Sequence, residues 1–187
     1  PIDSKNIILS NTNKYFNWTL PTKPQGEAEI SFRLSSNIQN LCKLNNKNDV
    51  FSYVDALAPS LELPYSVIDK NQNKELSLLI SDLCGSGYLV LGDVIPIQRF
   101  KSSAYEAIEI IQSSTRLESG STKNIIGSPK LSLFEFLNFA FENKLKLTKG
   151  QWIATGGCTP CTELVFNSRI QVKFQKSGCF SSVIMKQ

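Results

Sequence analysis

Acidic side chains in two short segments are the first candidates for chemistry in this chain. Glu27 and Glu29 are separated by one residue in the segment EAEISFRL, which alternates between polar and apolar residues. Because alternate side chains of a strand leave the same face, the two carboxylates would lie about 7 Å apart along one face. Glu62 follows in a mostly apolar context, ALAPSLEL. Three carboxylates meeting at one point would repel each other unless a cation neutralised them, and an oxygen-only site suits Mg²⁺ or Mn²⁺.

The same spacing also has a simpler explanation. Alternating glutamates describe the solvated face of an amphipathic strand equally well, and spacing alone favours that interpretation. The spacing does not show whether Glu62 approaches the other two side chains. Metal ligation and a solvated face therefore both remain open at this point.

The chain contains no histidine among its 187 residues. This absence excludes Ser-His-Asp triads, Cys-His dyads, HExxH zinc sites and Cys₂His₂ fingers. Cys158 and Cys161 have CxxC spacing, but the chain has no second CxxC, and the segment that follows them, LVFNSRIQVKF, is typical of a strand rather than the helix of a redox motif. We therefore expect reduced thiols in a turn and a cytoplasmic location.

Composition and charge are those of a globular domain. The 20 lysines and arginines against 16 aspartates and glutamates give a net charge of +4 with no basic block, so we expect no nucleic-acid partner. No apolar run reaches the ~18 residues that span a bilayer, so we expect no membrane association. The length is that of about one domain. We predict an irregular segment over residues 1–25 and a single domain over residues 26–187.

Hydrophobic periodicity predicts a chain with many strands and few helices. Alternating or short apolar stretches predict strands over 27–34, 61–68 (broken by Pro64), 88–91, 108–113 and 152–155, and a closing hairpin of 169–174 with 180–185. Helices are predicted over 50–58, 74–83 and 131–145, and a loop over 115–127. The last helix could begin with a capping box of Ser132 and Glu135 or at Ser128-Pro129. This pattern predicts an α+β fold with a mixed, mostly antiparallel β-sheet roll.

Several short segments follow one another between about residues 20 and 185 in an order that is similar to a known family. The segments and the family motifs that they resemble are Glu27–Ile30 (E-x-E), Ala58–Glu62 ((L/A)P-x-(I/L)E), Ser81–Gly87 (ADN-x-x-x-G), Ser119-Gly120 with Gly127–Pro129 (SG…G-x-P), Leu147–Gly156 (L-x-x-GD-x-(V/I)-x-TG) and the closing hairpin with Gly178. As an ordered set they resemble the fumarylacetoacetate hydrolase-like superfamily, in particular its 2-oxopent-4-enoate hydratase / 4-oxalocrotonate decarboxylase branch.

The resemblance implies a fold, a metal and a class of reaction. It implies the C-terminal-domain-like roll of that superfamily, a Mg²⁺ or Mn²⁺ ion, and hydratase or decarboxylase chemistry on a small 2-oxo acid (a 2-hydroxydienoate or a 4-oxalocrotonate-like acid) through a metal-stabilised enolate. It also suggests a homo-oligomer. The residues that it implicates are Glu27, Glu29 and Glu62 as metal ligands, Ser66, Thr155 and Gly156 as substrate contacts, and Asp82 as a catalytic group. No motif assigns a catalytic lysine, and Lys123 is a candidate only because it lies in the loop predicted over 115–127.

Departures from the family pattern leave the activity open. Val67 occupies the place of a frequent arginine, Leu83 that of an asparagine, and the residues before Glu27 show no clear counterpart of an upstream lysine and D-F-G-like motif. The chain is therefore either a divalent-metal-dependent lyase or a catalytically silent relative that binds a small acid or serves as a partner subunit. A redox role for Cys158 and Cys161 is the least favoured hypothesis.

Overall fold

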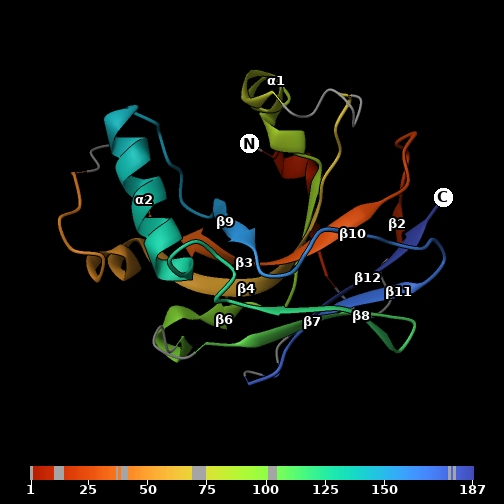
Figure 1. The fold of residues 1–187 in the computed structure, drawn as a ribbon. Helices are drawn as coiled ribbons and strands as arrows, with labels where there is room; N and C mark the ends of the chain where they lie inside the picture. The colour runs from red at the N-terminus through yellow and green to blue at the C-terminus, as the bar shows by residue number, and fades with distance from the viewer. Residues whose placement is uncertain are drawn as a thin grey trace.

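A computed structural model describes residues 2–10, 15–36, 38, 42–68, 75–100, 105–176, 178 and 180–187. Within these ranges the chain forms two β-sheets, with the helix α2 over one of them (Figure 1). The first sheet consists of β1 (Ile7–Leu9), β3 (Gln25–Leu34), β4 (Val54–Leu63), β5 (Tyr88–Leu91), β6 (Ile95–Pro96), β9 (Trp152–Gly157) and β10 (Thr162–Glu163). The second consists of β2 (Tyr15–Asn17), β7 (Ala107–Gln112), β8 (Thr115–Ser121), β11 (Arg169–Phe174) and β12 (Phe180–Lys186).

Strand pairing is mixed and mostly antiparallel, as the sequence predicted. The central path of the first sheet runs β1-β5-β4-β3-β10, with β6 beside β4 and β9 beside β3, and the second sheet has the order β2-β12-β11-β7-β8. Only β1 with β5 and β2 with β12 pair in parallel among the described strands. The helical elements are α1 (Leu76–Ser81), α2 (Pro129–Glu142) and four 3₁₀ turns, η1 (Ser4–Asn6), η2 (Asp49–Tyr53), η3 (Leu83–Gly85) and η4 (Ile97–Arg99).

The strand β3 separates the hydrophobic core from the polar face that carries the candidate site. Ala28, Ile30, Phe32 and Leu34 are each 0% exposed and belong to the same core as residues of the second sheet. The intervening side chains, which begin with Glu27 and Glu29, leave the opposite face of the strand because the side-chain period of a strand is two residues. The strict alternation of the sequence thus fixes which face of the sheet is chemically active.

The predicted helix over residues 50–58 is wrong. The chain makes only the 3₁₀ turn η2 there and then enters β4, where Pro59 lies in the middle of the strand. Pro59 lacks an N–H donor, which normally keeps proline out of central strands. It is tolerated because it lies between residues 56–57 of β4, which pair with β6, and residues 60–63, which pair with β5. β4 ends at Leu63, so the strand predicted over residues 61–68 overlaps only the last residues of β4.

Two segments expected to be irregular contain strands. β8 occupies the first part of the predicted loop over 115–127 and pairs antiparallel with β7, although most of its residues are exposed and polar. The segment before residue 26 contributes β1 to one sheet and β2 to the other. β1, β2 and β8 therefore form because each pairs with a neighbouring strand, which the polar local sequence does not predict.

The helix α2 begins at Ser128-Pro129. The Ser128 hydroxyl accepts a hydrogen bond from the Leu131 N–H, and Pro129 occupies the first helical position, where a missing N–H costs nothing. Of the two predicted starts, the one at Ser128-Pro129 is therefore confirmed, and the capping box of Ser132 and Glu135 is not formed because both residues lie inside the helix. None of the helices in the described ranges is long and apolar enough to cross a membrane.

Candidate metal centre

Pairing between β3 and β4 brings three glutamates together. Glu27 lies directly opposite Glu62 in the antiparallel register, and Glu29 lies opposite Ser60. One carboxylate oxygen from each of Glu27, Glu29 and Glu62 lies within 4.8 Å of the other two. Glu29 is only 3% exposed. The solvated-face interpretation of the alternating glutamates therefore fails, and the geometry is that of a cluster of acidic oxygens.

The carboxylates of this cluster resist ionisation in the absence of a cation. Burial, followed by the charge of Glu62, raises the pKa of Glu27 to about 7. Burial, followed by the charges of Glu62 and Glu27, also raises the pKa of Glu29, and a hydrogen bond from the Gly156 N–H opposes this only in part. Burial raises the pKa of Glu62 while hydrogen bonds from the other two carboxyls partly offset it. The site must hold protons or a cation to balance these charges.

The residues fit a hard divalent cation. The Oε2 atom of Glu29 is buried and has no hydrogen-bond partner among the described residues. None of the ion pairs within the described ranges involves Glu27, Glu29 or Glu62, so their charge is not balanced by a lysine or arginine there. Oxygen-only donors suit Mg²⁺ or Mn²⁺, and a buried oxygen without a partner is the kind of atom that a metal ion satisfies.

The end of β9 supplies the glycines that make room for the cluster. Gly156 has a φ of +106°, which side-chain-bearing residues rarely adopt, and its N–H donates to Glu29. A Cβ atom at Gly157 would overlap the Oε2 atom of Glu27. The register between β3 and β9 shifts between Glu29 and Ser31, at the point where these glycines approach β3. The Thr155-Gly156-Gly157 turn therefore brings backbone against the carboxylates at a distance that larger residues would not permit.

A cavity of about 530 Å³ lies beside the cluster. It is open to solvent and is lined by the end of β9, the first turns of α2 and the loop between β8 and α2. The described residues that line it are Glu27, Asn124, Ile125, Ile126, Ser132, Glu135, Thr155, Gly156, Gly157 and Thr159. Glu27 thus connects the acidic cluster with a space large enough for a small organic acid.

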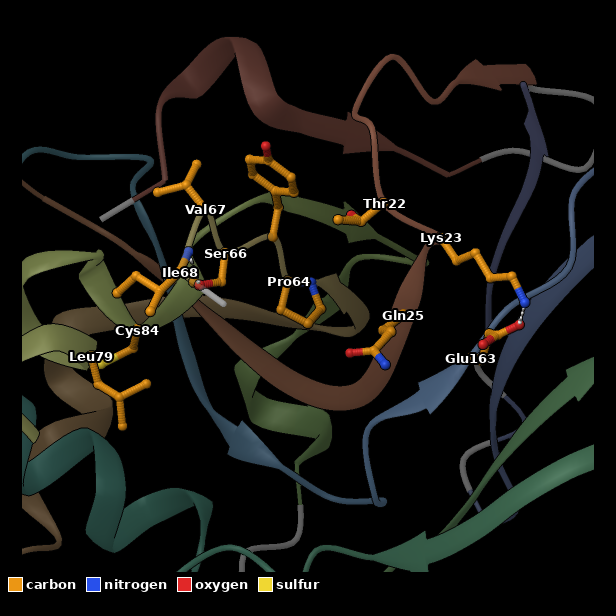
Figure 2. A pocket seen from close by; sticks show the side chains of 12 residues that line it. Thr22, Lys23, Gln25, Pro64, Ser66, Val67, Ile68, Leu79, Cys84 and Glu163 are labelled. Carbon is orange, nitrogen blue, oxygen red and sulfur yellow. Dashed lines mark hydrogen bonds and ion pairs between the residues drawn. The ribbon is translucent and has the colours of Figure 1, made fainter. Parts of the chain in front are cut away.

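A second hollow of about 810 Å³ lies near the start of β3 (Figure 2). Gln25 lines it and lies two residues before Glu27 on the strand. Ser66 also lines this hollow and accepts a hydrogen bond from the Ile68 N–H. The only charged side chains among its described lining residues are Lys23 and Glu163, which form an ion pair at 2.7 Å.

The structure divides the residues implicated by the resemblance between these two spaces. Glu27, Thr155 and Gly156 line the first cavity, whereas Ser66 lines the second hollow, with the neighbouring Val67 76% exposed. Thr155 is 5% exposed and its hydroxyl donates to the Ile30 carbonyl, so this side chain braces β9 against β3.

The two candidate catalytic groups are not among the described residues that line either space. The Lys123 ammonium lies 4.5 Å from the centroid of the Tyr105 ring. Asp82 follows the last residue of α1, and its Oδ2 atom is buried without a hydrogen-bond partner among the described residues. The geometry therefore does not bring Lys123 or Asp82 to the cavity beside the cluster.

Sequence reasoning missed the part that α2 plays in this cavity. Glu135 and Ser132 were considered only as a possible capping box, whereas both line the cavity and Ser132 donates its hydroxyl proton to the Thr155 carbonyl. The start at Ser128-Pro129, which the sequence also allowed, places Glu135 about two turns inside the helix and away from the capping positions.

Cys158 of the CxxC segment is a structural residue. It is 0% exposed, and burial followed by the nearby charge of Glu29 raises the pKa of its thiol to about 12. A reactive cysteine needs an accessible thiolate, which this environment disfavours. The geometry therefore argues against the redox hypothesis.

The comparisons with known proteins identify the fold. No protein-family model and no curated protein sequence matches the chain. Among solved structures, the 4-oxalocrotonate decarboxylase from Pseudomonas putida G7, complexed with magnesium and adipate, matches 97% of this chain with a TM-score of 0.81 and 18% identity, and this chain spans 66% of its length. The fumarylpyruvate hydrolase from Pseudomonas aeruginosa, in complex with Mn²⁺ and pyruvate, matches 96% of this chain and 73% of its own, with a TM-score of 0.71 and 12% identity.

A fumarylacetoacetate hydrolase family protein from yeast also matches, with a TM-score of 0.69 and 12% identity, over 97% of this chain and 82% of its own. At these identities the likeness is one of fold. The chain shares the fold of these three proteins, one of which is a fumarylacetoacetate hydrolase family protein, and this is the fold that its ordered motifs implied.

Proposed function

We propose that this chain binds Mg²⁺ or Mn²⁺ through Glu27, Glu29 and Glu62 and acts as a hydratase- or decarboxylase-type lyase on a small 2-oxo acid. The observation that carries the proposal is the convergence of three carboxylates, one of them with an unsatisfied buried oxygen, beside a cavity. The magnesium and adipate of the decarboxylase and the Mn²⁺ and pyruvate of the fumarylpyruvate hydrolase support it, because both pair a divalent metal with a small acid.

A divalent cation in this site would act as a Lewis acid on the carboxylate and keto oxygens of such an acid. The chain's own groups would fix the position of the substrate and exclude water. The Asn124 side chain is oriented by its donation to the Cys158 carbonyl, and the Thr159 hydroxyl accepts from the Ala28 N–H. Ile125, 4% exposed, supplies an apolar wall. Polar groups already held by the backbone lose little freedom when a substrate binds.

A catalytically silent, acid-binding relative is the second candidate. The observation that favours it is the position of the two candidate catalytic groups: Lys123 faces Tyr105, and neither Lys123 nor Asp82 is among the described residues that line the cavity. In addition, Val67 stands where the related motif often has an arginine. Both candidates require the metal site, and they differ only in turnover.

One experiment separates the two candidates. The Mn²⁺-loaded protein is assayed with a panel of 2-hydroxydienoates and 4-oxalocrotonate-like acids, following loss of the conjugated chromophore and release of CO₂. Turnover that disappears in Glu62→Gln and persists in Glu142→Gln, which alters an exposed residue at the end of α2, supports the lyase. Binding of the acids without turnover supports the silent relative. If the wild type does not bind Mn²⁺, both candidates are wrong.

A further inference from the structure

The cavity beside the three glutamates has an unusual charge for a site that would receive an organic acid. Among the described residues that line it, Glu27 and Glu135 are acidic and none is a lysine or arginine. Glu27 belongs to the metal cluster, where a divalent cation would offset two of the three carboxylate charges. Glu135 lies outside that cluster and adds an acidic side chain that no lysine or arginine among the described lining residues offsets.

The lysines nearest in sequence to this cavity are engaged elsewhere. Lys123, which precedes the lining residue Asn124, lies over the Tyr105 ring. Lys130, in the first turn of α2, donates to the Asn48 side chain and lies 5.4 Å from the centroid of the Phe51 ring. Neither ammonium group neutralises Glu135, which is exposed and takes part in none of the hydrogen bonds or ion pairs that the structure describes.

Two of the three hydroxyls of the same wall, those of Ser132 and Thr155, already donate within the protein. Ser132 donates to the Thr155 carbonyl, and Thr155 donates to the Ile30 carbonyl. Neither hydroxyl therefore has a proton to spare for an incoming carboxylate. Beside them Ile126 is 92% exposed and lines the cavity, so it presents an apolar surface at the opening.

We propose that Glu135 makes this site select 2-oxo acids with an uncharged far end over dicarboxylates. The inference rests on the proposed function, because it assumes that the 2-oxo carboxylate end of the ligand meets the metal. The rest of the molecule then extends along Ile126 and toward Glu135, where a second carboxylate would meet a like charge with no compensating cation. Of the two substrate classes considered above, this favours the 2-hydroxydienoates, which have one carboxylate, over the 4-oxalocrotonate-like diacids.

The test compares two ligands of equal chain length, 2-oxopentanoate and 2-oxoglutarate, which differ by a terminal carboxylate. Their affinities for the Mn²⁺-loaded protein are measured by calorimetry. We expect 2-oxopentanoate to bind tighter by on the order of fivefold, the effect of a like-charge contact in a solvent-accessible site. Glu135→Gln should reduce this preference toward unity and Glu135→Lys should reverse it, while Glu142→Gln, on the same helix, should leave it unchanged. The Mn²⁺ affinity should be the same in all four proteins.

Salt provides a second readout that a purely structural role of Glu135 would not produce. Higher ionic strength should reduce the preference of the wild type for 2-oxopentanoate over 2-oxoglutarate, because salt screens exposed charges. The affinity ratio of Glu135→Gln for the two acids should not change with ionic strength. If Mn²⁺ binds but the wild type prefers 2-oxoglutarate, or if Glu135→Gln and Glu135→Lys keep the preference of the wild type, the inference is overturned while the metal site stands. Failure of the wild type to bind Mn²⁺ refutes the proposed function, and the inference falls with it.

Discussion

Replacement of Glu27 by glutamine should have opposite effects on the metal-free and the metal-loaded protein. Glu27 has a pKa raised to about 7 from 4.5, first by burial and then by the charge of Glu62. A group whose pKa is higher in the folded state stabilises the fold fully below its unfolded value, and this contribution is lost as the pH rises through the folded value. The metal-free wild type should therefore lose stability between about pH 4.5 and about pH 7.

The size of this loss follows from the shift. A change of one pKa unit corresponds to about 1.4 kcal/mol, so the raised pKa of Glu27 corresponds to about 3 kcal/mol, and partial exposure of the side chain reduces this to about 2 kcal/mol. Glutamine has the same shape beside Gly157 and cannot ionise. Glu27→Gln should therefore stabilise the metal-free protein at pH 8 by about 2 kcal/mol, which raises the Tm by roughly 4–8 °C for a chain of this length.

In the presence of Mn²⁺ the wild type should be more stable than Glu27→Gln. The wild type gains stability from metal binding, whereas Glu27→Gln has lost one of its carboxylate ligands and should bind Mn²⁺ at least about 100-fold more weakly. Calorimetric unfolding of both proteins at pH 5 and pH 8, after treatment with EDTA and after addition of Mn²⁺, measures both effects, with Glu142→Gln as the control. A metal-free variant less stable than the wild type at pH 8, or equal stabilisation of the two by Mn²⁺, would refute the reasoning.

Three further predictions concern the same site. Because protons compete with the cation for Glu27, the Mn²⁺ affinity should rise between about pH 5 and about pH 8 with release of protons, which calorimetry in buffers of different ionisation enthalpy detects; a pH-independent affinity would contradict this. Gly157→Ala should displace the Glu27 carboxylate and weaken Mn²⁺ binding by about tenfold or more, measured by titration, and an unchanged affinity would show that the glycine is not needed for the cluster. Cys158 should resist alkylation in the folded protein while the exposed Cys84 reacts, as mass spectrometry of the labelled peptides would show; early labelling of Cys158 would contradict its assigned burial.

The sequence predicted β3 well because its pattern is local. Alternation of Ala28, Ile30, Phe32 and Leu34 with polar residues determines both the strand and its buried face, and the structure agrees residue by residue. The closing hairpin of β11 and β12 was predictable for the same reason. Such patterns depend only on the period of two residues and not on what the strand pairs with.

The convergence of the glutamates could not be read from the sequence because it depends on a long-range pairing. Glu62 reaches Glu27 only through the register of β3 with β4, and the first half of β4 was assigned to a helix. Local preference in VFSYVDALA was overridden by pairing on both edges of the strand, which the sequence does not display. The motif resemblance supplied the correct grouping of the three residues although the predicted secondary structure around Glu62 was wrong.

The cavity beside the metal cluster was the least predictable part. Its wall joins the loop before α2, the helix itself and the end of β9, so Ile126, Glu135 and Gly156 become neighbours only after packing. Lys123 was a candidate because it lies in that loop, but its ammonium prefers the face of the Tyr105 ring. Residue type and proximity in the sequence do not determine the direction of a side chain in a loop.

The most direct test of the central claim is anomalous diffraction from crystals of the protein soaked in Mn²⁺. We expect one Mn²⁺ ion per chain, bound jointly by the carboxylates of Glu27, Glu29 and Glu62 at about 2.0–2.3 Å. The ion should be absent from crystals of Glu29→Ala that are grown and soaked in the same way. A Mn²⁺ peak at another site, or no peak between the three glutamates in the wild type, would contradict the claim that this cluster is a metal centre.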